Sequence, residues 1–349
     1  MARVSTLARL CAALAVIPVL AGCTGQGRNT PPPASARATL PRAAAAQVNF
    51  ALVRRDGTVN HIYLMHIDAA GRGFGLRRLT GDPQAEGNPV WSPDGQRILY
   101  TRDLDGSGIY LINVNGTGQR RLSPVPGMDT TPDWSPDGTK IVYTRLLSPP
   151  EPGAPPPLTQ IRVMNANGTG DHVILGPTRF SIEPRWSVRN QIVFASLMHG
   201  SRLEVYRMNA NGSGLVQLTF TGINSDPRWS PDGTRICFGS DRQGGGNVNL
   251  FLMNADGSHV LQLTRFSPPI EAGDSDWSPD GARIAFEWTS AATGSPIPPP
   301  SPRSGPSTRT APTRPAPASR PAVPAPTLAG GQLQLPVVNS RSWVEFCQP

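Results

Sequence analysis

Lysine is almost absent from this chain of 349 residues: Lys140 is the only one, and the other basic residues are arginines. Residues 1–46 and 289–349 hold ten of the 32 basic residues and one of the 24 acidic residues, which leaves 22 basic and 23 acidic residues in the middle. The formal net charge of +8 therefore comes from the two ends. A near-neutral middle lacks the basic, aromatic-interleaved stripe that binds phosphates, so we expect no nucleic-acid partner.

The apolar run near the N-terminus is too short to cross a bilayer. It covers residues 10–20, whereas a transmembrane helix needs about 20 residues. Arg3 and Arg9 precede the run, and Ala21 and Gly22 follow it. A charged start, a short apolar core and small residues are typical of a secretory signal peptide, so residues 1–22 are predicted to direct export.

Leu20-Ala21-Gly22-Cys23 also resembles the bacterial lipobox. The resemblance implies that Cys23 becomes the first mature residue and carries a diacylglycerol, with acyl chains such as palmitate, at the extracytoplasmic face of the inner or outer membrane. Two acyl chains anchor a protein stably where one is marginal. Residues 23–46 are then the lipidated cysteine and a flexible tether rich in Pro, Ala and Gly. A plain signal peptide with a chance cysteine is the alternative.

Cysteine is scarce, with four residues in the chain. Cys11 leaves with the signal peptide and Cys23 is taken by the lipid, so Cys237 and Cys347 remain. One disulfide is conceivable. We favour a free thiol, because Cys237 lies in an apolar segment, where cysteine packs as a small buried hydrophobe.

Glycine and proline are plentiful, and part of them recurs at a regular interval. Trp-Ser-Pro-Asp-Gly occurs four times, and residues 186–190 are a degenerate copy, Trp-Ser-Val-Arg-Asn, in a loop one residue shorter. A short apolar segment follows each copy; in four units a second apolar segment ends in Asn-Gly or Asp-Gly, and Leu-Thr or Leu-Ser commonly closes the unit. The repeated tryptophans are 43, 52, 43 and 48 residues apart: Trp91, Trp134, Trp186, Trp229 and Trp277.

The conformational preferences of turn residues explain why these residue types recur. Proline presets φ for a turn, and glycine adopts the positive φ that a side chain disfavours. Asn-Gly and Asp-Gly are the favoured two-residue hairpin turns. Asn190 stands in place of glycine in the degenerate copy, and asparagine tolerates positive φ better than most residues.

Four short strands per unit, with no helical segment between them, predict an all-β propeller of four-stranded antiparallel blades. A single sheet cannot bury both faces, so blades stack radially, with the tryptophans between neighbours. We favour six blades, which result if the terminal pieces stay separate or pair with the C-terminal segment. Five result if the Trp277 strand completes the first blade. The propeller is predicted to cover residues 47–288.

The repeats resemble the TolB-like, WD40-like propeller family, whose pattern is Trp-Ser-Pro-Asp-Gly, an apolar strand, a second strand ending in Asp-Gly, then Leu-Thr. The resemblance implies a propeller domain in a bacterial envelope protein, six-bladed in TolB itself. The N-terminal α/β domain of TolB is expected to be missing, because signal and tether account for the residues before Val48.

The C-terminal region differs in composition. Residues 289–331 consist mainly of Pro, Ser, Thr, Ala and Arg, with too little apolar surface to offset ordering, so disorder is predicted. Residues 332–349 regain apolar character and are suited to a last-blade strand. A shifted reading frame after Glu287 is the alternative origin of this end.

Residues that recur in every blade are expected to be structural, which removes the Ser and Asp of the turns as a nucleophile and an acid. No common catalytic motif occurs, and the five histidines are scattered, so we expect no catalytic residues, no metal and no cofactor. In up-and-down blades the uniform turns share one face, here named the turn face. The variable face is opposite and consists of residues 102–108, 147–159, 198–203 and 241–247 and the segments before each tryptophan. Because binding residues concentrate on loops of a rigid scaffold, the variable face is the predicted partner face.

A mixed-charge ring precedes the tryptophans at the predicted mouth of the central channel. It is suited to a peptide, a sugar or a cation; the alternative is solvated loop ends and salt bridges between blades. The candidate binding residues are Asp133, Glu183, Arg185, Asp226, Arg228, Asp274 and Asp276.

The sequence thus favours a monomeric, non-catalytic envelope lipoprotein whose variable face binds an envelope protein or a cell-wall glycan. Two alternatives stay open. One is a propeller enzyme of the peptidase or polysaccharide-lyase kind, and the other is a sensor or scaffold domain for a membrane partner. Fold does not fix function, so the site must decide between them.

Overall fold

The computed structural model describes residues 48–56, 59–67, 73–103, 107–151, 154–244, 246–268, 270–290 and 343–347. The predicted signal peptide, Cys23, the tether and nearly all of segment 289–331 lie outside the described residues.

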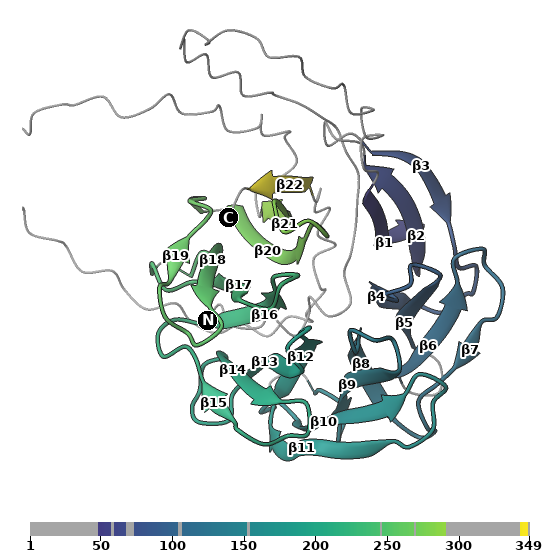
Figure 1. Cartoon of the computed structure of the whole chain (residues 1–349), viewed down its shortest axis with the longest axis horizontal. Helices are drawn as coiled ribbons and strands as arrows, with labels where there is room; N and C mark the ends of the chain where they lie inside the picture. The colour runs from purple at the N-terminus through teal and green to yellow at the C-terminus, as the bar shows by residue number, and fades with distance from the viewer. Residues whose placement is uncertain are drawn as a thin grey trace, which may run out of the picture. The chain divides into compact units, whose positions relative to one another are not determined.

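The described residues form 22 strands in six antiparallel sheets arranged around a common centre (Figure 1). The first sheet contains β1 (Val48–Asp56), β2 (Val59–Ile67) and β3 (Gly73–Arg78). Four four-stranded blades follow: β4 (Glu86–Trp91), β5 (Arg97–Asp103), β6 (Ser107–Asn113) and β7 (Arg120–Arg121); β8 (Met128–Trp134), β9 (Lys140–Leu146), β10 (Leu158–Asn165) and β11 (His172–Arg179); β12 (Ser181–Trp186), β13 (Gln191–Ser196), β14 (Glu204–Asn209) and β15 (Val216–Gln217); β16 (Asn224–Trp229), β17 (Arg235–Ser240), β18 (Asn249–Asn254) and β19 (Leu261–Gln262). The last sheet contains β20 (Ile270–Trp277), β21 (Ile284–Ser290) and β22 (Trp343–Cys347).

This architecture confirms the predicted all-β propeller of antiparallel four-stranded blades. The strands that end in the repeated tryptophans, β4, β8, β12, β16 and β20, lie innermost in their sheets (Figure 1). β20 pairs with β21 and so belongs to a separate last sheet, the arrangement expected for six blades. β22, from the C-terminal segment, adds a third strand to that sheet.

The hydrophobic core lies between neighbouring sheets. Leu99 and Ile109 of one blade pack with Trp134 and Tyr143 of the next, and none of the four is more than 4% exposed. Deleting a buried tryptophan side chain typically costs about 3–5 kcal/mol. Cys237 is buried, outside any disulfide, in another such layer, between β16–β19 and β20–β22.

Hydrogen bonds fix each Trp-Ser-Pro-Asp-Gly turn. In the first copy the Ser92 hydroxyl donates to Asp94 Oδ1 at 2.5 Å, and that oxygen also accepts from the Gln96 amide at 3.0 Å. The Gly95 amide donates to the Ser92 carbonyl, with φ of 66° at Gly95. The copies at residues 135–138, 230–233 and 278–281 make the same serine–aspartate bond, so these side chains serve the turn.

The degenerate turn obeys the same backbone rule. Asn190 has φ of 56°, and its amide donates to the Ser187 carbonyl at 3.0 Å. The expected use of asparagine in the left-handed region is therefore confirmed.

The hydroxyl that closes each unit also has a fixed partner. Thr80 Oγ1 accepts from the Ile62 amide and Thr219 Oγ1 from the Val205 amide. Ser123 and Thr264 accept equivalent bonds from Ile109 and Leu250. In three of the four-stranded units, Ser123, Thr219 and Thr264 thus satisfy an amide near the start of the third strand, whereas Thr80 satisfies an amide within β2.

No helix in the described part of the chain is long and apolar enough to span a membrane.

Gly95→Ala tests the role of positive φ in the turns. A Cβ at Gly95 meets no atom within 4 Å, so the cost comes from backbone conformation alone. We expect urea unfolding to show a loss of about 1–2 kcal/mol in the free energy of unfolding. Gly81→Ala is the matched control, since Gly81 also has open space but no positive φ, and an equal loss there would contradict this explanation.

A candidate binding face above a polar inner wall

The five innermost strands share a left-handed residue three positions before each tryptophan. Positive φ values occur at every one of these positions, and the pairing with the second strand shifts register at the same place. The values are 49° at Asn88, 48° at Thr131, 58° at Glu183, 51° at Asp226 and 42° at Asp274. A non-glycine residue at such φ is costly unless its surroundings hold it, which marks the position as functionally or structurally constrained.

A proline follows the left-handed residue in four of these strands, at Pro89, Pro132, Pro184 and Pro227. Proline has no amide hydrogen and is tolerated at bulges, where no ladder bond is needed. Sequence reasoning missed this bulge, although the recurring X-Pro-X-Trp was its signal.

Hydrogen bonds through these residues join β8 to β12 and β12 to β16. The Glu183 amide donates to Thr131 Oγ1 at 3.3 Å, and the Asp226 amide donates to Glu183 Oε2 at 2.8 Å. Trp186 and Arg185 also reach back, to Asp133 Oδ2 at 2.8 Å and the Pro132 carbonyl at 3.0 Å. The predicted site residues Asp133, Glu183 and Arg185 therefore join blades.

The seven candidate residues differ in solvent accessibility. Glu183 and Arg185 are buried, and Asp133, Asp226 and Arg228 are half-buried. Asp274 and Asp276, on the last innermost strand, are exposed, and Asp276 Oδ1 accepts from the Trp277 amide. A role of these residues in partner binding stays a prediction.

Burial and mutual repulsion govern the protonation of this wall. Burial, followed by the charge of Glu183, raises the pKa of Asp226 to about 7. Asp274 is exposed, and repulsion from Asp226 is the first cause that raises its pKa to about 6. Burial also raises the pKa of Glu183, and burial followed by the charge of Arg228 lowers that of Arg185 to about 10.

Two guanidinium groups add unused donors to the wall. The Nε atoms of Arg185 and Arg228 are buried and have no hydrogen-bond partner. A wall that combines carboxyl groups with such donors can bind both hydrogen-bond donors and hydrogen-bond acceptors of a ligand. Within the described residues, no three His, Cys, Asp or Glu side chains are placed to hold a metal ion together.

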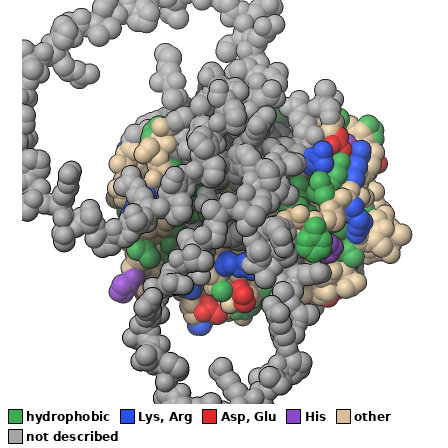
Figure 2. All heavy atoms as spheres, turned by 90° about the horizontal axis from the view of Figure 1, so that it is seen from above, with side chains coloured by type: hydrophobic (Ala, Val, Ile, Leu, Met, Phe, Trp, Pro, Cys, Tyr) green, Lys and Arg blue, Asp and Glu red, His purple; other side chains and the backbone are tan. Residues whose placement is uncertain are grey.

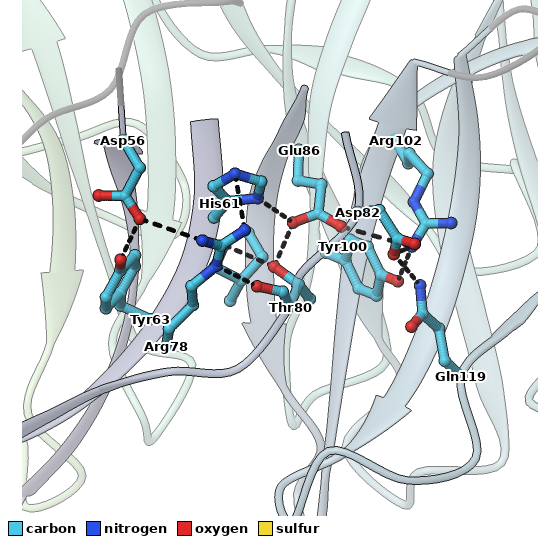
Figure 3. A network of polar contacts seen from close by, with 11 residues as sticks. Asp56, His61, Tyr63, Arg78, Thr80, Asp82, Glu86, Tyr100, Arg102 and Gln119 are labelled. Atoms are coloured by element: carbon cyan, nitrogen blue, oxygen red, sulfur yellow. Dashed lines mark hydrogen bonds and ion pairs between the residues drawn. The ribbon is translucent and has the colours of Figure 1, made fainter. Parts of the chain in front are cut away.

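Figure 3 shows the polar network that holds the first connection of the variable face. Buried Glu86 accepts from the Thr80 hydroxyl, and its Oε1 lies 3.4 Å from Arg102 Nη2. Arg102 also pairs with Asp82, and its guanidinium carbon lies 4.6 Å from the centroid of the Tyr110 ring. Burial raises the pKa of Glu86. The connection from Thr80 to Glu86 is thus tied to both sheets.

The next junction uses the same chemistry. Asp129 is fully buried and accepts two hydrogen bonds from Arg145, at 2.6 and 2.8 Å. This pairing raises the pKa of the Arg145 guanidinium. Two charge-assisted bonds in one plane fix direction as well as distance, so the start of β8 is rigid.

Above this support the variable face exposes large apolar side chains. Phe220 is 72% exposed, Val125 62%, Leu158 48% and Leu147 45%. Val125, Leu147 and Phe220 lie in connections of the variable face, and Leu158 is the first residue of β10, at the end of segment 147–159. Apolar residues on rigidly anchored loops suit the core of a protein interface.

Charge on the surface is mixed in sign. In the face seen in Figure 2, Lys and Arg side chains lie next to Asp and Glu side chains in two of the visible areas of described residues, at the upper right and at the bottom. This pattern agrees with the near-neutral middle of the chain.

A family model described as the TolB beta propeller domain matches residues 39–147 and 159–297. The chain belongs to this family. The Tol-Pal system protein TolB of Francisella tularensis is 27% identical over 109 residues, which are 31% of this chain and 25% of the relative. The match thus spans about a quarter of the length of such curated TolB relatives.

Solved propellers show the same fold. TolB from Acinetobacter baumannii has a TM-score of 0.57 and 19% identity, covering 69% of this chain and 60% of that chain. An oligogalacturonate lyase from Vibrio parahaemolyticus has a TM-score of 0.51 and 13% identity, covering 71% and 68%. At these identities the likeness concerns the fold alone, and it extends from a TolB to an enzyme.

The raised pKa values of Asp226 and Asp274 predict a pH dependence of stability. Between about pH 4 and 7 the folded protein binds more protons than the unfolded chain, so the free energy of unfolding falls as pH rises through this range. We expect Tm to be lower at pH 8 than at pH 5 by about 3 °C or more, since each kcal/mol shifts Tm by about 2–4 °C. Asp226→Asn should remove much of this difference.

Asp256→Asn is the control, because hydrogen bonds from Ser258 lower the pKa of this exposed carboxyl. Its contribution is present above the unfolded pKa and is lost as the pH falls below about 4. Thermal melts of this variant should keep the wild-type change between pH 5 and 8. A wild-type Tm that rises over that interval would contradict the assigned pKa shifts.

Proposed function

We propose that this TolB-family propeller is a non-catalytic envelope protein that binds a protein partner through its variable face. The observation that carries the proposal is the exposure of Phe220, Val125, Leu147 and Leu158 on connections of that face. Buried networks hold two of its connections, at Glu86 and Asp129, so binding costs little ordering of these loops.

The inner wall supports the same proposal with polar groups. Asp274 and Asp276 are exposed, and Arg185 and Arg228 each keep an unpaired Nε–H. A central polar patch beside apolar loops gives a partner both orientation and buried area. The Francisella relative's name, Tol-Pal system protein, supports an envelope protein as the partner class, and a cell-wall glycan is the competing outcome.

An extracytoplasmic location completes the proposal. The predicted signal peptide and the lipobox-like Leu20-Ala21-Gly22-Cys23 support export and attachment through a lipid on Cys23. A tethered propeller would meet partners in the envelope within reach of residues 24–46.

Affinity capture tests the partner face. Mature protein is immobilised, envelope extract is passed over it, and bound proteins are identified and titrated. Phe220→Ser and Asp274→Ala should each lower the affinity for the captured protein at least tenfold, the loss expected for a contact that contributes about 1.4 kcal/mol. The account predicts that protease treatment of the extract abolishes capture.

Leu261→Ser is the matched control for Phe220→Ser. Leu261 is 53% exposed but lies on the outer strand β19, away from the variable face. It should leave capture unchanged. An equal loss of capture in both variants would contradict the proposed protein interface. Capture that survives protease treatment of the extract and disappears after glycan digestion would contradict it as well.

Cell fractionation tests the anchor. Cys23→Ser should move the protein from the membrane pellet to the soluble fraction, because no thiol remains for the lipid at that position. Cys11→Ser changes a cysteine inside the predicted signal peptide and should leave the protein in the pellet. A Cys23→Ser protein that still sediments with membranes would disprove lipid attachment there.

A further inference from the structure

A pocket of about 480 Å³ lies on the turn face, between blades β8–β11 and β12–β15. Its lining includes Asp137 and Lys140 from one blade and Trp186, Val188 and Asn211 from the next. The degenerate turn lies at this junction, so the pocket opens where the repeat is one residue short.

At two of the other three junctions an arginine side chain fills the equivalent place. Arg97 lies over the Trp134 ring of the next blade, 4.9 Å from its centroid, and its Nη2 pairs with Asp94 Oδ2 at 3.2 Å. Arg235 lies over the Trp277 ring at 5.2 Å. A guanidinium on a tryptophan face gains from cation–π attraction, and a carboxylate alongside adds a charged hydrogen bond.

Lys140 holds the position equivalent to Arg97 and Arg235, directly after its turn. Among the described residues neither its ammonium nor any arginine lies over the Trp186 ring. At the following junction Arg189 donates to the Asp232 carbonyl at 3.0 Å. Of the four junctions between described turns, three are thus bridged by an arginine, and the pocket marks the fourth.

The indole of Trp186 is also hydrogen-bonded differently from those of Trp229 and Trp277. The indole N–H groups of Trp229 and Trp277 donate to carbonyls of the preceding blade, Arg185 and Arg228. The Trp186 indole instead donates to Asn190 Oδ1 in its own turn, at 3.1 Å, and is half-buried. Its ring therefore lines the pocket with its one polar group already satisfied.

The pocket also contains a carboxylate, that of Asp137, at the position that Asp94 has in the first turn. Hydrogen bonds from Ser135 and Thr139 lower the pKa of Asp137 to about 2, so it is charged at neutral pH. The corresponding Asp94 is paired with Arg97, whereas no ion pair to Asp137 occurs among the described residues.

We propose that this pocket binds an arginine side chain of a peptide partner, with the guanidinium over Trp186 and paired with Asp137. The bound group would reproduce the contacts that Arg97 makes with Trp134 and Asp94 inside the same chain. The site lies on the face opposite the proposed partner face, so the two proposals succeed or fail independently.

Titration of the full-length protein with acetyl-Gly-Arg-Gly-amide, followed by the indole N–H resonance of Trp186 in NMR spectra, measures binding. We expect a shift of that resonance and binding at least fivefold tighter than that of acetyl-Gly-Lys-Gly-amide, because lysine lacks the planar fork. Equal affinity for the two peptides, or tighter binding of a neutral sugar such as N-acetylglucosamine, would overturn the proposal.

Two changes at Lys140 should act in opposite directions. Lys140→Arg restores the internal guanidinium, so it should occupy the pocket and reduce peptide affinity at least fivefold. Lys140→Met removes a repelling charge and should increase affinity about twofold or more. Unchanged peptide affinity in Lys140→Arg would disprove the proposal that the pocket binds arginine because this junction lacks an arginine of its own.

Asp137→Asn and Asp94→Asn form a matched pair. Both keep an oxygen for the turn serine, but only Asp137 lines the pocket. Asp137→Asn should weaken the arginine peptide at least fivefold, and Asp94→Asn should leave its affinity unchanged. Equal effects of the two variants would show that the carboxylate acts on the turns rather than on the ligand.

Discussion

Three neighbouring blades are joined by hydrogen bonds at the left-handed residues of their innermost strands β8, β12 and β16. A four-stranded sheet has two faces to bury and cannot do so alone, so each blade depends on its neighbours. At Thr131 and Glu183 the side chain of one strand accepts the amide of the next, which turns strained backbone into a bond between blades. The same contact brings the carboxyl groups of Glu183 and Asp226 into the inner wall, where burial raises their pKa values.

Repeated residues and variable residues have separate tasks in this architecture. Ser92 and Asp94 satisfy the amides of a turn, and Ser123 satisfies an amide near the start of a third strand. Because these needs recur in each blade, the residues recur as well. The connections of the variable face carry no such requirement, and side chains such as Phe220 are free to remain exposed.

The fold could be predicted because its signals are local. Asp94 and Gly95 encode a turn by their own conformational preferences, and Asn190 could be recognised as a substitute for glycine on the same ground. Four short strands per repeat, with no helical segment between them, then left few arrangements other than a propeller.

The inner wall could be located but not described in advance. Thr131 and Glu183 do not favour positive φ, so their conformation is imposed by the bulge and the neighbouring blade. The same position in the repeat is buried at Glu183 and exposed at Asp274, a difference that depends on what packs beside each blade. The pocket between Lys140 and Trp186 joins residues from different repeats and becomes visible only when blades are placed side by side.

The central claim is that the repeats build a scaffold and the variable face binds. Hydrogen exchange of the full-length protein, with and without its captured partner, tests this claim most directly. The account predicts slower amide exchange in the connections 123–128, 147–151 and 219–224, with the turns at 92–95 and 135–138 unchanged. Protection confined to those turns or to the outer strands, with no change on the variable face, would contradict it.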